Sequence, residues 1–111
     1  MSQLTTHILD TTKGKPAAGV SITLFCQHSD WEELTSGITN ADGRITDLLA
    51  PDIVLPLGIY KLKFETQPYF DTIGTASFYP FIEIVFEVTT SEHYHVPLLL
   101  NPFGYTTYRG S

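Results

Sequence analysis

Few cysteines and few basic residues set the first limits on this chain. Cys26 is the only cysteine in 111 residues, so a framework of intrachain disulfides is excluded and no oxidising compartment is required. Six Lys and Arg against twelve Asp and Glu give a net charge of −6, and the basic residues form no cluster. Nucleic acid and anionic membrane surfaces are therefore disfavoured as partners.

Long apolar runs and leader-like segments are also missing. No stretch approaches the ~18 consecutive apolar residues of a membrane-spanning helix, and the first residues lack the charged, apolar and small-residue pattern of a secretory signal. We therefore expect a cytoplasmic protein. The length and the 42% of hydrophobic residues fit one domain, residues 1–111, with a single core.

Stretches rich in the helix formers Ala, Leu and Glu are scarce, and segments with β-type alternation take their place. Within residues 19–27, Val20, Ile22 and Leu24 alternate with more polar residues, which predicts a strand with one buried face. Residues 58–66 alternate in the same way, with Tyr60, Leu62 and Phe64 on one face of a half-buried strand. Further strands are predicted at 4–9, 31–39, 81–89, 93–100 and 103–108. One short helix is expected around 68–74. About eight short strands separated by turns indicate an all-β sandwich of two sheets.

Local features add detail to this outline. The alternation within 81–89 indicates a central strand, whereas Pro97 lacks an N–H group and so indicates an edge strand or a bulge. Residues 40–43, Asn-Ala-Asp-Gly, predict a tight turn with the glycine at positive φ. Arg44 follows that turn directly, so its side chain is held in a fixed direction. Residues 47–58 are interpreted as an irregular connection.

Two histidines, His93 and His95, lie two residues apart in a predicted strand and therefore face the same side. Such a pair suits proton transfer or metal binding, although a strand histidine is also commonly a hydrogen-bonded surface residue. A metal site needs a third protein ligand, which His7 could supply, but no spacing in the sequence requires it. All three interpretations stay open from the residues alone.

A set of motifs is spread over nearly the whole chain, at residues 4–11, 14–17, 39–44, 78–80, 93–100 and 105–111. With these motifs the chain resembles the 5-hydroxyisourate hydrolases, the transthyretin-related enzymes of purine breakdown. The final Tyr108-Arg109-Gly110-Ser111 is the most specific of them, because hormone-carrying transthyretins share the fold and lack that ending. Two departures from the family pattern are the long apolar segment 49–57 and Asn101, where a serine is common.

The resemblance implies a transthyretin-like homotetramer with active sites in a channel between subunits. It implies hydrolysis of 5-hydroxyisourate to 2-oxo-4-hydroxy-4-carboxy-5-ureidoimidazoline in urate degradation, with no cofactor and no metal. The catalytic residues would be His7, Arg44 and His95. Two of these, His7 and Arg44, would also bind the substrate together with Tyr108. The supporting residues would be Arg109, Gly110 and Ser111.

The chemistry implied by the resemblance is attack of water on a ring carbonyl and cleavage of the cyclic amide C–N bond. A histidine with an ordinary pKa of about 6.5 suits the activation of water near neutral pH. We expect His7 and His95 to share the proton transfers, in an order that the sequence leaves open. The alternatives are a transthyretin-like carrier of small ligands and a metal-binding β-sandwich built on the His-x-His pair.

Overall fold

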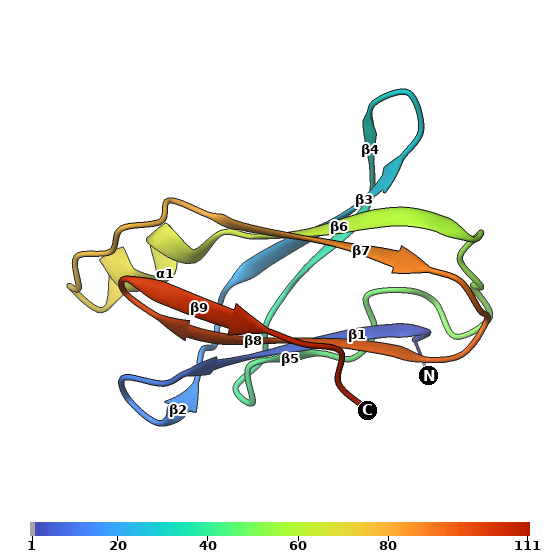
Figure 1. The fold of residues 1–111 in the computed structure, drawn as a ribbon. Coiled ribbons are helices and arrows are strands. Elements are labelled where there is room, and N and C mark those ends of the chain that lie inside the picture. The colour runs from blue at the N-terminus through green and yellow to red at the C-terminus, as the bar shows by residue number, and fades with distance from the viewer. Residues whose placement is uncertain (1) are drawn as a thin grey trace.

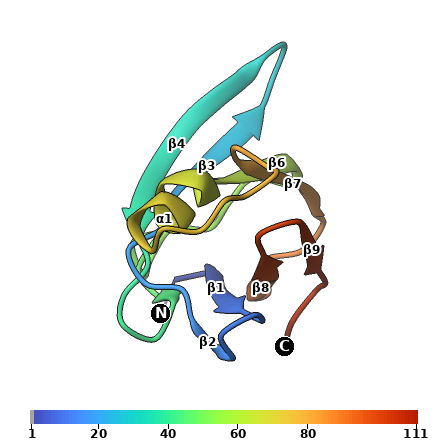
Figure 2. The ribbon, with the colours of Figure 1, turned by 90° about the vertical axis from the view of Figure 1, so that its left-hand side faces the viewer.

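Two β-sheets lie face to face and form two layers in the computed structural model, which describes residues 2–111 (Figures 1 and 2). The four-stranded sheet has the order β4-β3-β6-β7. Its strands are β3 (Ser21–Gln27), β4 (Trp31–Ile38), β6 (Gly58–Phe64) and β7 (Ile82–Val88). The other sheet contains β1 (Leu4–Asp10), β2 (Lys15–Pro16), β5 (Arg44–Ile45), β8 (Tyr94–Asn101) and β9 (Gly104–Thr107). The predicted all-β sandwich is confirmed.

Side chains from both sheets meet between the layers and form the core. Tyr60, Leu62 and Phe64 on β6 are buried, and so are Ile22 and Leu24 on β3, as the alternation in the sequence predicted. Burial of each large apolar side chain contributes about 1.5–3 kcal/mol to folding. The opposite faces of the same strands point away from the core. The functional side chains lie on such an outer face.

Three strands pair with β1, and their registers bring the functional residues together. Along one edge β8 runs parallel to β1, with Thr5 opposite His95 and His7 opposite Pro97. Along the other edge β5 pairs with β1, and Arg44 lies opposite His7. Residues opposite each other on neighbouring strands point to the same face of a sheet. The side chains of Thr5, His7, Arg44 and His95 therefore share one face, which is the face away from the core.

The position of Pro97 differs from the prediction. β8 lies between β1 and β9, so Pro97 is in an interior strand and not at an edge. The Val96 carbonyl accepts a hydrogen bond from the Thr6 hydroxyl on β1. Because the backbone polar groups of successive strand residues point to opposite sides, those of Pro97 face β9. On that side the ladder of β9 ends at Thr107 and pairing resumes only at Gly110. The missing N–H group of proline therefore falls in a gap of the ladder.

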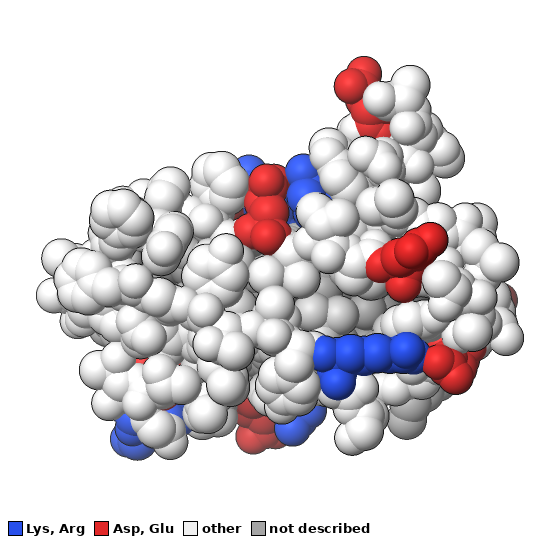
Figure 3. Space-filling view, viewed as in Figure 1, with Lys and Arg blue, Asp and Glu red and all other residues white. Residues whose placement is uncertain are grey.

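A second expectation also needs correction. β7 pairs only with β6 and is an edge strand of its sheet, whereas the alternation had indicated a central strand. The expected short helix is confirmed as α1 (Thr66–Thr72), the single helix among the described residues, and it begins two residues before the predicted start. No helix within residues 2–111 is long and apolar enough to cross a membrane. Basic and acidic side chains are scattered over the face shown in Figure 3, without a basic patch.

Candidate active site

The imidazole rings of His7 and His95 contact each other on the outer face of the β1–β8 pair. His7 Nδ1 and His95 Nε2 are 2.7 Å apart, which is the distance of a short hydrogen bond. The rings lie nearly parallel, with centroids 4.9 Å apart and an interplanar angle of 19°. His95 is almost fully buried, with 8% of its surface exposed, whereas His7 is half-buried. The two rings therefore share one proton between facing nitrogens.

Arg44 is held beside His7 by the turn that precedes β5. The Asn40 side-chain oxygen accepts hydrogen bonds from the backbone N–H groups of Asp42 and Arg44, at 2.9 and 3.0 Å. Gly43 adopts φ +70°, and a Cβ atom there would lie 2.5 Å from the Ile8 carbonyl oxygen on β1. Glycine is thus needed both for the turn and for its close approach to β1. The predicted turn is present and places the guanidinium next to the imidazole pair.

Burial and the nearby guanidinium both favour neutral imidazoles at this site. The pKa of His7 is lowered, first by burial and then by the positive charge of Arg44. The pKa of His95 is also lowered, first by burial and then by the charges of His7, Arg44 and His93, with a backbone contact to Thr5 opposing the shift. Near pH 7 both rings are therefore unprotonated on one nitrogen and able to accept a proton.

The C-terminal segment closes against His95. The Gly110 N–H donates a hydrogen bond of 2.8 Å to the His95 carbonyl. A Cβ atom at Gly110 would lie only 2.6 Å from His95 Cδ2 and 3.2 Å from Pro97 Cγ, so glycine lets this segment approach the ring. Arg109 pairs with Glu92 and lies over the Tyr94 ring, 4.5 Å from its centre.

A cavity of about 250 Å³ opens beside His95 of the imidazole pair, and His7 is not among the residues that line it. Its walls come from β1, from β5 and the residue after it, from the start of β8 and from the C-terminal segment. The residues that line it are Thr5, Thr6, Arg44, Thr46, His93, His95 and Ser111. It thus offers a guanidinium, imidazole nitrogens and hydroxyl groups to a small polar ligand. A planar heterocycle with carbonyl oxygens fits that set, because a guanidinium presents several donors in one plane.

Comparison with known proteins agrees with these features. The model of the HIUase/Transthyretin family matches residues 4–110. This chain belongs to that family. A mouse 5-hydroxyisourate hydrolase is 49% identical over 116 residues, which cover 99% of this chain and 96% of the mouse protein.

Similar solved structures include a hydrolase and a transthyretin. Klebsiella pneumoniae 5-hydroxyisourate hydrolase superposes with a TM-score of 0.87 at 41% identity, covering 97% of this chain and 98% of that one. Sea bream transthyretin in complex with thyroxine superposes with a TM-score of 0.91 at 33% identity, covering 98% and 95%. The backbone alone therefore does not separate these two proteins, and the decision rests on the side chains of the site.

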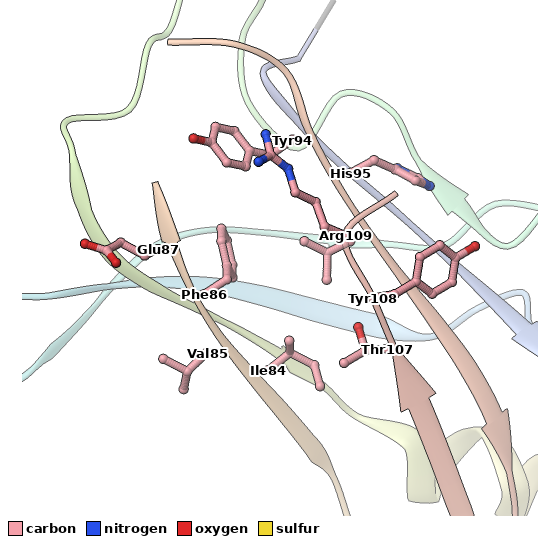
Figure 4. Close-up of a pocket in the computed structure, with 10 residues that line it drawn as sticks. Ile84, Val85, Phe86, Glu87, Tyr94, His95, Thr107, Tyr108 and Arg109 are labelled. Carbon is pink, nitrogen blue, oxygen red and sulfur yellow. The ribbon is translucent and has the colours of Figure 1, made fainter. Parts of the chain in front are cut away.

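Tyr108, predicted to bind substrate, lies apart from the cavity of Arg44 in the single chain. It lines a second hollow of about 240 Å³ between β7 and the C-terminal segment, and it is 53% exposed. Figure 4 shows Arg109 reaching toward Tyr94 on the other side of this hollow from Tyr108. His95 lines both hollows and connects them. Residues 108–111 thus divide between the two, with Ser111 on the side of Arg44.

One residue of the site was missed by sequence reasoning. The Thr5 hydroxyl lies 2.7 Å from His95 Nδ1 and 2.9 Å from His93 Nε2, so it contacts both histidines of the His-x-His pair. A threonine in a β-type run is ordinary, and nothing in the local sequence marks it as functional. Only the parallel register of β1 and β8, which joins residues ninety positions apart, reveals its place.

The metal-binding alternative finds no ready ligand set in the part of the chain that the structure describes. No group of three or more His, Cys, Asp or Glu side chains there is arranged to hold a metal ion. The nitrogens of His7 and His95 point at each other, and His93 and His95 both point at Thr5. A metal ligand must instead direct its lone pair at the shared ion.

Proposed function

We propose that this chain hydrolyses 5-hydroxyisourate to 2-oxo-4-hydroxy-4-carboxy-5-ureidoimidazoline. The observation that carries the proposal is the contact between two neutral imidazoles beside a guanidinium, at the edge of a small polar cavity. Curated relatives named 5-hydroxyisourate hydrolase, 41–49% identical over nearly the full chain, support it.

The imidazole pair supplies the proton chemistry. Water adds to a ring carbonyl while one imidazole nitrogen takes a proton from it, and the cyclic amide C–N bond then breaks as the leaving nitrogen receives a proton. No covalent bond between substrate and protein is needed. A base that is neutral near pH 7 is required, and the lowered pKa values of His7 and His95 provide it. General acid–base catalysis of this kind contributes ~10²–10⁴-fold.

Arg44 binds the substrate and stabilises the reaction. Its guanidinium donates to the carbonyl oxygens of the planar ring, and it stabilises the negative charge that forms when the carbonyl becomes tetrahedral. It also holds the pKa values of the two imidazoles down, so the same charge serves two purposes. Tyr108 contacts the substrate from the C-terminal segment, while Arg109, Gly110 and Ser111 keep that segment against His95.

The active unit in this proposal is a homotetramer with sites between subunits. β7 and β9 are open edge strands, which can pair with another chain. Val85 on β7 is exposed, and Phe78 and Phe103 near the helical end are 70% and 69% exposed. A second chain that covers these residues would also close the hollow in which Tyr108 lies. Sedimentation should give four chains, and monomers that turn over substrate normally would contradict this part.

The test is the disappearance of freshly generated 5-hydroxyisourate, followed by its ultraviolet absorbance. The chain at catalytic concentration should speed the loss far above the spontaneous rate, in proportion to its concentration. A rate equal to spontaneous decay would contradict the proposal. Stoichiometric binding of thyroxine without turnover would then favour a carrier, as the superposition with sea bream transthyretin allows. The cytoplasmic location stays a prediction.

A further inference from the structure

The Thr5 hydroxyl joins His93 to the imidazole pair in one continuous chain of hydrogen bonds. Going outward from His7, the distances are 2.7 Å from His7 Nδ1 to His95 Nε2, 2.7 Å from His95 Nδ1 to Thr5 Oγ1, and 2.9 Å from Thr5 Oγ1 to His93 Nε2. Thr5 and His95 are buried, whereas His93 is exposed. This series of hydrogen bonds therefore joins the half-buried His7 to the exposed His93, and Thr5, His93 and His95 line the cavity beside it.

The Thr5 hydroxyl has one proton, and the direction in which it is donated couples the tautomers of the three rings. Thr5 can donate to only one imidazole, and leaving its buried proton without a partner is costly. If Thr5 donates to His93, it accepts from His95 Nδ1–H, and His95 Nε2 accepts from His7 Nδ1–H. All three neutral rings then carry the proton on Nδ1, and His7 Nε2 is a free base. If every bond reverses, all three carry it on Nε2, and His7 Nε2–H is an acid.

We propose that Thr5 and His93 are positioning residues and that protons pass through Thr5 between the imidazole pair and the exposed ring of His93, so that His7 acts first as base and then as acid. This rests on the proposed hydrolysis. The starting state is the one with every proton on Nδ1. His7 Nε2 takes a proton from the attacking water, and protons then move from His7 to His95, from His95 to Thr5, and from Thr5 to His93 Nε2.

The products of this relay balance in atoms and charge. Hydroxide has added to the substrate, His7 and His95 are neutral with their protons on Nε2, and His93 is an imidazolium ion. His7 Nε2–H is now an acid and can protonate a leaving nitrogen that is bound at this atom. When it does so, the protons move in the reverse direction, from His93 to Thr5, from Thr5 to His95 and from His95 to His7. His93 thereby loses its extra proton and becomes neutral again. The starting state is restored with no proton gained or lost by the protein.

The charges around this series of hydrogen bonds explain why the relay is useful. Burial, and after it the charge of Arg44 from β5, disfavours a positive charge on His7 and His95 and lowers the pKa values of both rings. His93 is exposed, so solvent stabilises its cation. Its neighbour Glu92 is already paired with Arg109 from the C-terminal segment. The relay therefore moves the positive charge from a buried position beside a guanidinium to the surface.

The kinetic test compares two substitutions at Thr5. Thr5→Val keeps the shape of the side chain and removes the hydroxyl, whereas Thr5→Ser keeps the hydroxyl. We expect Thr5→Val to lower kcat by roughly 10-fold or more with KM changed less than about 2-fold, and Thr5→Ser to stay close to wild type. Equal kcat values for Thr5→Val and wild type would overturn the relay. If Thr5→Val does not fold, His93→Gln replaces it, with the same expected loss of kcat.

The structural test reads the tautomers directly. Nitrogen-15 spectra of the imidazoles distinguish Nδ1–H from Nε2–H, and the chain has only four histidines, of which His28 lies outside the site. Near neutral pH, His7, His93 and His95 should share one tautomer in wild type and lose that match in Thr5→Val. Mixed tautomers in wild type would overturn the relay even if hydrolysis is normal. Absent hydrolysis with matched tautomers would instead overturn the proposed function.

Discussion

Each sheet carries a buried basic side chain on its outer face, in contact with one or more side-chain rings. The charged groups beside these two side chains differ in sign. On the four-stranded sheet, Lys61 is buried with its ammonium 4.5 Å from the centre of the Trp31 ring and 4.9 Å from that of Phe25. Glu83 lies 3.0 Å from it. On the five-stranded sheet, His95 lies against His7, and the nearby fixed charge is the cation Arg44.

The difference between the two faces shows how the charge of the neighbouring groups adds to the effect of burial on a basic side chain. The neighbours of Lys61 are aromatic faces and a carboxylate, which are favourable contacts for a cation. At the imidazole pair, burial and the neighbouring guanidinium both penalise a further positive charge, so the imidazoles are held neutral and free to exchange protons. The first arrangement strengthens the sheet, and the second provides a base.

The largest effect is expected when the imidazole pair is broken. His95→Ala removes the ring that contacts both His7 and Thr5, and it should lower kcat for 5-hydroxyisourate by ~10²–10⁴-fold. His28→Ala, in the loop between β3 and β4, is the matched control and should retain the wild-type rate. Stopped-flow absorbance measures both. A His95→Ala protein that is folded and nearly as active as wild type would remove the basis of the proposed site.

Replacing Arg44 should remove the cation that distinguishes the two faces. Arg44→Gln keeps hydrogen-bond donors but no charge, and kcat should fall by ~10²–10³-fold because the developing negative charge loses its partner. The same change should raise the pKa values of both imidazoles, since Arg44 lowers them. The fall in activity on acidification would then begin at a higher pH than in wild type. A pH profile of kcat/KM checks this shift, and an unchanged or downward shift contradicts it.

A smaller effect is expected when the C-terminal segment is pushed away from His95. Gly110→Ala puts a methyl group 2.6 Å from His95 Cδ2, so the ring or the segment must move, and kcat should fall by roughly 10-fold or more. Gly104→Ala is the control, because its Cβ would meet only the Asn101 side chain at 3.6 Å, an ordinary contact. Equal rates for the two variants would show that this close approach has no part in catalysis.

The smallest effect is expected on the other face. Lys61→Met keeps the length of the side chain and removes its charge, so the free energy of unfolding should fall by about 1 kcal/mol while kcat stays at the wild-type value. Lys13→Met, in the exposed loop before β2, should change neither the free energy of unfolding nor kcat. Urea denaturation measures the free energy of unfolding. A Lys61→Met protein with reduced kcat and unchanged stability would mean that the two faces are not independent.

Local sequence patterns predicted much of the fold and the faces of its strands. Alternation gave the buried side of β3 and β6, the spacing of His93 and His95 put both on one face, and the turn ending at Gly43 placed Arg44. These features depend on residues only a few positions apart, which is the range over which periodicity and turn propensity carry information.

Pairings between distant segments were beyond that range. The parallel contact of β1 with β8 joins Thr5 to His95, and neither strand carries a local signal for its partner. The same limit explains why β7 was taken for a central strand and Pro97 for a residue of an edge strand or a bulge, since alternation and proline describe a strand and not its neighbours. The resemblance to a known family supplied His7, Arg44 and Tyr108 as site residues, and composition alone did not.

The proposed chemistry depends on two imidazoles that stay neutral in contact with each other beside a guanidinium. A pH titration of the wild-type histidine rings, followed by nuclear magnetic resonance and assigned with His7→Gln and His95→Gln, measures this property. We expect His7 and His95 both to gain their second proton below the ordinary histidine pKa of about 6.5. Titration of either ring at or above that value would contradict it.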